Sequence, residues 1–306
     1  MTQKSWVFNE TVPTEMNGQS LKTLLSEYWG LPKHLVYSIR HGERVLIEGS
    51  YRPVNFAVTS GEHVELTFVP SDFATPFPNV APDSAATVEI LYEDANLVVI
   101  NKRRGDKTHP NQPGEVGATI NHLAAYLETE NTVPYMIHRL DQETSGALIF
   151  AKNPAVVPIL VANIAHKQIT RKYLAWVEGT GLPKDGTIDQ PIGRDPDDKR
   201  KRLINGTNAV NAVTHFQVIK EEGGNSLLSI ELETGRTHQI RVHFAAIGHP
   251  LVGDPLYNSS NESDYLMLHS WKVGLILPFS KILKTVTAPI PSHFIDFQKQ
   301  LESRHE

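Results

Sequence analysis

The chain has 306 residues, of which 40% are hydrophobic and 21% charged, and its formal net charge is −5. This is ordinary globular composition, and the length predicts two domains, because single cores rarely grow beyond about 250 residues. The absence of cysteine excludes disulfides, thiolate nucleophiles, iron–sulfur clusters and cysteine-ligated zinc. The negative charge means that any nucleic-acid site must be a local basic patch.

The N-terminal residues lack the apolar segment of a signal peptide. The longest apolar runs, at 97–100 and 147–151, are far shorter than the roughly 20 residues that span a membrane. We therefore expect a cytoplasmic protein without a membrane partner. Three basic clusters are candidates for phosphate contact, although a single charge run more often marks a solvated surface. They are Lys33, His34, Arg40, His41 and Arg44, then Lys102, Arg103, Arg104 and Lys107, then Arg194, Lys199, Arg200, Lys201 and Arg202.

Residues 1–71 predict a small α/β domain. Two helix faces are marked by Leu21, Leu24 and Leu25 and by Leu35, Tyr37 and Ile39, and turn signals flank short strands at 44–47 and 63–68. Residues 15–69 resemble the alpha-L RNA-binding module, named after a ribosomal small-subunit protein. The resemblance implies that the second helix and its following loop bind RNA through Lys33, Arg40 and Arg44. The alternative is a small domain that packs on the rest of the chain.

Residues 72–86 contain three prolines and no apolar period, which is typical of a linker. Residues 87–306 form the second domain. Strands are predicted at 88–92, 97–101, 147–151, 172–177, 210–219 and 227–232, and helices at 120–127, at 155–165 and around Ile240, Phe244 and Ile247. Strands in runs with few helices indicate an α+β fold with a mostly antiparallel mixed sheet. Glycine loops that bind nucleotide phosphates are missing, so no nucleotide cofactor is expected.

The segment from His138 to Gly146 reads His-Arg-Leu-Asp-Gln-Glu-Thr-Ser-Gly. A lone Asp before a strand is most often a turn former. Here, however, the segment is similar at every fixed position to the central motif of RluA-type pseudouridine synthases, which is His-Arg-Leu-Asp, two variable residues and Thr-Ser-Gly. The resemblance spans about residues 88–291. It implies a pseudouridine synthase catalytic domain with Asp141 as the essential carboxylate.

Three further segments carry the same resemblance in order. Asn101, Lys102, His109 and Pro110 match the first motif, except that Arg103 stands where the family usually has proline, which leaves the loop shape open. Residues 172–175 match the strand that bears the active-site tyrosine, here Tyr173. Residues 234–243, with Gly253 and Asp254, match the third motif. His238 and His243 are five residues apart and fall on different sides of a helix, so no metal site is expected.

The resemblance implies roles for these residues. Asp141 attacks carbon 1′ or removes the proton from carbon 2′, and the sequence does not choose between the two routes. Arg241, or alternatively Arg236, is the cation that keeps the carboxylate charged. Tyr173 stacks on the flipped uridine and Arg139 fills the space that it leaves. The residues expected to contact RNA are His138, Arg139, Lys102, Arg236, Lys33, Arg40 and Arg44.

The sequence thus predicts a monomeric isomerase that converts uridines of structured RNA to pseudouridine without cofactor or metal. Ribosomal RNA is the first expected substrate and transfer RNA the second. One alternative is a noncatalytic RNA-binding or ribosome-assembly factor on the same fold. Another is a hydrolase that uses Ser145, although this serine lacks the glycine pattern of a nucleophile elbow.

Overall fold

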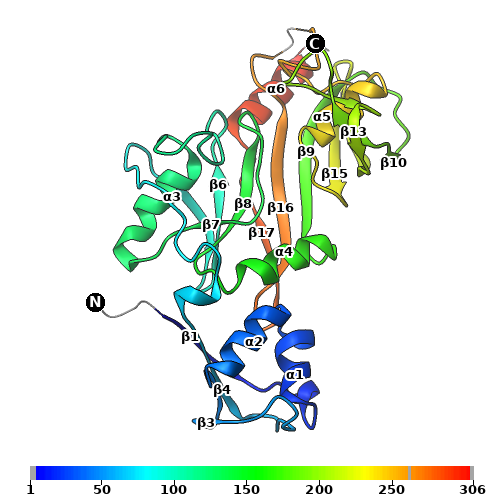
Figure 1. Ribbon diagram of the computed structural model, residues 1–306. Coiled ribbons are helices and arrows are strands. Elements are labelled where there is room, and N and C mark those ends of the chain that lie inside the picture. Colours follow the sequence, from blue (N-terminus) through cyan, green and yellow to red (C-terminus); the bar gives the residue numbers. More distant parts are fainter. Residues whose placement is uncertain (1–4, 261–262, 304–306) are drawn as a thin grey trace.

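The computed structural model describes residues 5–260 and 263–303. A small N-terminal module lies at one end of a larger domain with a long central sheet (Figure 1). Among the described residues, no helix combines the length and the apolar character needed to cross a membrane.

The N-terminal module is a four-stranded antiparallel sheet with two helical segments packed on it. The strand order is β1-β4-β2-β3. The leucines that indicate the first helix face are buried, as are Leu35 and Ile39 of the second. The first strand was not expected from the sequence, and it pairs along its whole length with β4. The elements are β1 (Trp6–Thr11), α1 (Leu21–Thr23), which continues into a π-helical turn (Leu24–Tyr28), α2 (Lys33–His41), β2 (Val45–Ile47), β3 (Ser50–Tyr51) and β4 (His63–Phe68).

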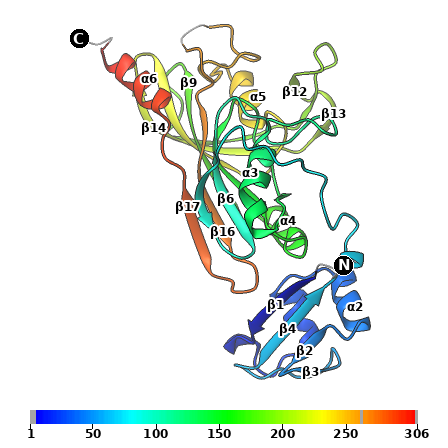
Figure 2. The same ribbon diagram turned by 90° about the vertical axis from the view of Figure 1, so that its left-hand side faces the viewer.

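The larger domain is built on a ten-stranded sheet of order β10-β14-β15-β9-β16-β8-β6-β5, with β17 paired to β16 and β7 to β8. Among the strands of the described residues, only β16 and β8 pair in parallel, which confirms the predicted α+β fold with a mostly antiparallel sheet. A three-stranded sheet, β12-β11-β13, lies beside α5 (Figure 2). The elements are β5 (Glu89–Glu93), β6 (Leu97–Lys102), α3 (Thr119–Leu127), β7 (Tyr135–Met136), β8 (Ser145–Ala151), α4 (Val157–Ala165), β9 (Thr170–Glu178), β10 (Asp185–Asp189), β11 (Ile192–Arg194), β12 (Arg202–Ile204), β13 (Thr207–Val210), β14 (Val213–Glu222), β15 (Asn225–Leu232), α5 (Gln239–Ala246), β16 (Leu268–Ile276), β17 (Leu283–Thr287) and α6 (Ser292–Glu302).

The central strand β16 was not predicted. It mixes the polar residues His269, Ser270 and Lys272 with apolar ones, so it shows neither a clean alternation nor a continuous apolar run. Its middle position comes from pairing with β8 on one side and β9 on the other. Because these partners are distant in sequence, only the tertiary fold identifies the strand.

The module and the larger domain share one apolar core. The Phe279 ring lies 5.0 Å from Phe8 and 5.8 Å from Trp29, measured between ring centroids. The intervening segment 72–86 is fixed on both sides, since Phe73 packs on Trp6 at 5.5 Å and the Ala81 carbonyl accepts a hydrogen bond from Asn121 at 2.7 Å. The segment therefore follows the protein surface instead of hanging free between the two parts.

Candidate active site

Asp141 lies in the loop that leads into β8. The Thr144 amide donates to the Asp141 carbonyl oxygen at 3.1 Å and closes a turn around this residue. Gly146 follows with a φ of +109°, and a Cβ at this position would lie 2.1 Å from the Ser270 carbonyl oxygen. Glycine is therefore required for β8 and β16 to approach each other here. This close strand pairing explains why the motif ends in glycine.

The Asp141 carboxylate faces the guanidinium of Arg241, at 3.3 Å between Oδ2 and Nη1. The same guanidinium donates two shorter hydrogen bonds to Asp254, from Nε at 2.8 Å and from Nη2 at 2.7 Å. Arg241 is thus the cation beside Asp141, as expected. The bidentate contact is made by Asp254, which occupies the Nε–Nη2 edge of the guanidinium and leaves Nη1 for Asp141.

His238 is the second group beside Asp141. It precedes α5 with a φ of 57°, and its Nε2 lies 3.8 Å from the Asp141 carboxylate. Its Nδ1 lies 2.9 Å from the hydroxyl of Tyr257, which itself accepts the Arg202 amide at 2.7 Å. The tyrosine proton is then available to Nδ1, which directs the Nε2 hydrogen of His238 toward Asp141. Burial lowers the pKa of His238, so the ring is neutral near pH 7.

The other histidine of this motif and the candidate serine nucleophile have structural positions. His243 is buried, with Nδ1 at 2.8 Å from the Thr214 hydroxyl and Nε2 at 3.0 Å from the Gln190 carbonyl oxygen. Ser145, the first residue of β8, is buried, and its hydroxyl lies 2.8 Å from His269 Nδ1 on β16. Residues 5–260 and 263–303 contain no cluster of three metal-binding side chains.

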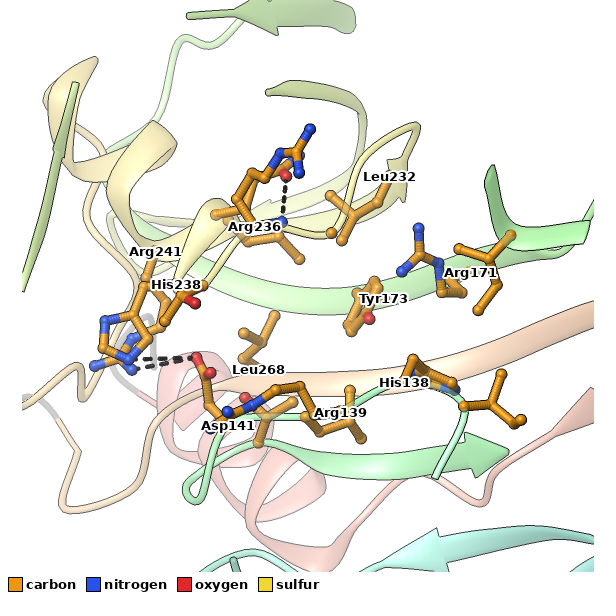
Figure 3. A pocket seen from close by; sticks show the side chains of 18 residues that line it. His138, Arg139, Asp141, Arg171, Tyr173, Leu232, Arg236, His238, Arg241 and Leu268 are labelled. Carbon is orange, nitrogen blue, oxygen red and sulfur yellow. Dashed lines mark hydrogen bonds and ion pairs between the residues drawn. The ribbon is translucent and has the colours of Figure 1, made fainter. Parts of the chain in front are cut away.

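Asp141, Arg241 and His238 line a cavity of about 370 Å³ (Figure 3). Tyr173 on β9 contributes to its wall and is 5% exposed. Burial raises the pKa of Tyr173, so the phenol is neutral near pH 7. The exposed side chains of Arg139 and Arg236 also line the cavity. The full lining is Ile137, His138, Arg139, Leu140, Asp141, Thr144, Ile164, Arg171, Tyr173, Leu232, Gly235, Arg236, Thr237, His238, Gln239, Ile240, Arg241 and Leu268.

Lys102 does not have the position that RNA contact requires. Its side chain is 1% exposed, and its ammonium group donates to the carbonyl oxygens of Arg103, Gln142 and Thr144 at 2.9, 3.0 and 2.9 Å. These three bonds use all three donors of the group. The prediction that Lys102 binds RNA is therefore wrong, and Lys102 instead fixes the loop that carries Asp141.

The loop in which Arg103 replaces the usual proline is closed by ion pairs. Arg103 lies 3.1 Å from Asp106. Arg104 pairs with Glu143, two residues after Asp141. These ion pairs hold the loop of Arg103 and Arg104 against the loop that carries Asp141, although the rigid proline is missing.

His138 lines the cavity, but its ring is engaged with the protein. Its Nε2 accepts the Ile149 amide at 3.1 Å. Burial, aided by the positive charge of Arg171, lowers the pKa of His138 to about 3. His138 is therefore neutral at physiological pH and does not offer a positive charge to phosphate.

The basic residues of the N-terminal module differ in availability. Arg44 forms a two-point ion pair with the buried carboxylate of Asp72, at 2.6 and 2.9 Å, so its charge is neutralised. Lys33 is exposed and Arg40 partly exposed on α2. Both line a groove of about 1060 Å³ whose opposite wall includes His166, at the end of α4. RNA binding by Lys33 and Arg40 stays a prediction.

Asp254, Tyr257 and Arg171 were not among the candidate functional residues. The sequence placed Asp254 in the third motif, but it did not predict that Asp254 binds Arg241. Arg171 precedes Tyr173 by two positions on one strand, so both side chains point to the same face. That alternation was the available signal for Arg171.

The comparisons with known proteins assign this mostly antiparallel fold and its carboxylate-centred cavity to the RNA-modifying isomerases. Residues 96–246 match the family model described as RNA pseudouridylate synthase, and residues 8–64 match the N-terminal domain of RluD ribosomal pseudouridine synthase. The chain belongs to the RNA pseudouridylate synthase family. It is an isomerase that acts on RNA.

Individual relatives agree with this assignment over most of the chain. An uncharacterized RNA pseudouridine synthase of Bacillus subtilis, YhcT, is 34% identical over 95% of this chain and 96% of its own length. Ribosomal large subunit pseudouridine synthase D of Escherichia coli is 32% identical over 97% of this chain and 94% of its own. The solved structure of human RNA pseudouridylate synthase domain containing 1 is similar with a TM-score of 0.58 and 27% identity, covering 69% of this chain and 87% of the human one.

Proposed function

We propose that this pseudouridine synthase modifies ribosomal RNA and uses Asp141 as its essential carboxylate. The observation that carries the assignment of Asp141 is its ion pair with Arg241 inside the cavity. The name of the Escherichia coli relative and the match of residues 8–64 support a ribosomal substrate. Transfer RNA is the second candidate.

The reaction breaks the bond between ribose carbon 1′ and uracil nitrogen 1 and forms a bond from carbon 1′ to carbon 5. Carbon 5 loses its proton and nitrogen 1 ends protonated, so no redox or group-transfer reagent enters the balance. Asp141 either attacks carbon 1′ or removes the proton from carbon 2′. Both routes need an ionised carboxylate, and the guanidinium of Arg241 lies 3.3 Å from it.

Tyr173 is proposed to support the base during this rearrangement. Its aromatic ring lies in the cavity wall and offers a stacking surface to uracil. Because burial raises its pKa, a phenolate is costly. The hydroxyl oxygen accepts the carbon 5 proton only if the hydroxyl gives up its own proton in the same step, and that proton balances the one that nitrogen 1 gains.

The target uridine must leave its stack to reach a cavity lined by protein, and flipping a base costs a few kcal/mol, least in loops. Arg139 is proposed to fill the vacated space and Arg236 to contact the RNA backbone. Lys33 and Arg40 are proposed to hold flanking RNA in the groove between α2 and α4. A Lys33→Glu variant that binds ribosomal RNA with unchanged affinity and salt dependence would contradict this last role.

The central experiment is Asp141→Asn, which keeps the side-chain size and removes the negative charge. We expect tritium release from carbon 5 of labelled uridine in ribosomal RNA to vanish, while RNA affinity stays close to wild type, because backbone contacts dominate it. A melting curve serves as the folding control. Turnover within tenfold of wild type in a folded sample would remove Asp141 from the mechanism.

The RNA substrate, the cellular location and the oligomeric state are tested separately. Sequencing-based mapping of pseudouridine in ribosomal and transfer RNA, from cells with and without the protein, should show a site lost from ribosomal RNA. A site lost only from transfer RNA would overturn the proposed substrate. We also propose a cytoplasmic monomer, which cell fractionation and light scattering test directly.

A further inference from the structure

The far end of the active-site cavity holds a buried arginine that forms no ion pair with an acid of residues 5–260 or 263–303. Arg171 is 5% exposed and lines the cavity. Its Nε is fully buried and has no hydrogen-bond partner among the described residues. Of the described residues that line the cavity, Asp141 is the one acid, and its nearest guanidinium contact is Arg241.

The third motif leaves room for this arginine. A Cβ at Gly235 would lie 2.8 Å from Arg171 Nη1. No left-handed φ requires glycine at that position, and in the observed rotamer the guanidinium occupies the space that a side chain would need. The glycine of the Thr-Gly-Arg-Thr-His segment and the arginine on β9 are therefore parts of one arrangement.

The position of Arg171 relative to the reacting groups suggests what it binds. Figure 3 shows Tyr173 between Asp141 at one end of the cavity and Arg171 at the other. A nucleotide with carbon 1′ at Asp141 and its base on Tyr173 brings further oxygen atoms of the same nucleotide toward Arg171. An unpaired guanidinium in a buried site is costly until an acceptor completes it.

We propose that Arg171 is a substrate-binding residue that donates hydrogen bonds to an oxygen acceptor of the target nucleotide. This rests on the proposed function, because it assumes that the uridine occupies this cavity. Two acceptors have the required chemistry, namely a carbonyl oxygen of uracil and a phosphate oxygen beside the nucleoside. The guanidinium fork fits either one.

The test compares Arg171→Met with Lys172→Met. Lys172 is the neighbouring residue on β9, and its 47% exposed side chain pairs with Glu231 outside the cavity. We expect Arg171→Met to lower kcat/KM on ribosomal RNA by about 10- to 100-fold, the range for losing a charged hydrogen bond. The melting temperature should stay equal or rise, because a buried unpaired charge is replaced by an apolar chain. Lys172→Met should keep wild-type turnover.

Uridine and uridine 5′-monophosphate, used as competitive inhibitors of tritium release, identify the acceptor. If it is a uracil carbonyl, both inhibitors weaken by the same factor in Arg171→Met. If it is phosphate, only the monophosphate weakens. The proposal is overturned if kcat/KM and both inhibition constants stay at wild-type values, or if activity falls only in step with a lowered melting temperature. The Asp141→Asn result is independent, so failure of the mechanism and failure of this site are distinguishable.

Discussion

Each end of the cavity contains a buried arginine, and the two arginines differ in their ion pairing. Arg241 and Arg171 are 4% and 5% exposed and line the same space. Arg241 is held by two carboxylates, Asp254 and Asp141. Arg171 has a buried Nε without a partner in the described structure. The ion pairs of Arg241 therefore exist before the substrate binds, whereas Arg171 is proposed to gain its hydrogen bonds only from the substrate.

This difference follows from what each end has to do. In the proposed mechanism the carboxylate of Asp141 must be ionised and correctly oriented when the reaction begins, so its neighbours are fixed in advance. A group that recognises the substrate gains more if its hydrogen bonds form on binding, because those bonds then contribute to affinity and selection. The unpaired charge at that end lowers the stability of the free protein.

The largest effect is expected from a substitution of Asp254, which holds the guanidinium of Arg241. Asp254→Asn removes one charge of a buried pair whose carboxylate side chain is 0% exposed, and we expect a loss of about 3–5 kcal/mol in the free energy of unfolding. Turnover should fall by about two orders of magnitude or more, because Arg241 is no longer aligned beside Asp141. Urea denaturation and tritium release measure the two effects.

The matched acid is Asp198, which forms a surface pair with Arg200 in an exposed turn. Asp198→Asn should leave turnover and stability unchanged. If Asp254→Asn behaved in the same way, the contrast between the two ends of the cavity would disappear.

A smaller effect is expected for Tyr173, which lies between the two ends of the cavity. Tyr173→Phe keeps the ring that stacks on the base and removes the hydroxyl, so RNA affinity should be retained while kcat falls by about 10²-fold, as expected when a proton-transfer group is lost. Single-turnover tritium release and a filter-binding assay separate the two quantities. Wild-type kcat would assign Tyr173 to stacking alone.

The smallest effect concerns His138, which lies at the Arg171 end. Its folded pKa of about 3 lies below the ordinary value of 6.5, so the unfolded chain takes up the proton first and acid favours unfolding. This contribution to stability is fully present above pH 6.5 and is lost as the pH falls toward 3. His138→Gln keeps an acceptor for the Ile149 amide and does not titrate.

Between pH 7 and pH 5 the wild type should therefore lose about 1 kcal/mol more than His138→Gln, allowing for the partial exposure of the ring. Urea midpoints at the two pH values measure the difference. Equal losses in both proteins would show that His138 is not held neutral by its surroundings.

The sequence predicted the chemistry better than the surroundings of the reacting group. The motif residues from His138 to Gly146 suffice to identify the family, because they are contiguous in the chain and can be compared position by position. Ion partners were harder to predict. Asp254 lies 113 positions from Asp141 in sequence, and no local pattern indicates that both bind one guanidinium.

Lys102 illustrates the same limit. A cluster of basic residues predicts phosphate contact from charge alone, but three carbonyl oxygens from two different loops surround its ammonium group. Arg44 is similarly neutralised by Asp72. Charge is a property of the sequence, whereas its availability depends on which groups the fold brings within hydrogen-bond distance.

The sequence by itself determined the α+β class, the family, several of the strands and most of the helices, since these follow from local periodicity and from contiguous motifs, and it made Asp141 the candidate carboxylate. The tertiary structure decided the central place of β16, the division of Arg241 between Asp254 and Asp141, the burial of Lys102 and the unpaired state of Arg171. All of these depend on contacts between segments that are far apart along the chain, and their energies come from burial and pairing that exist only once the sheet has formed.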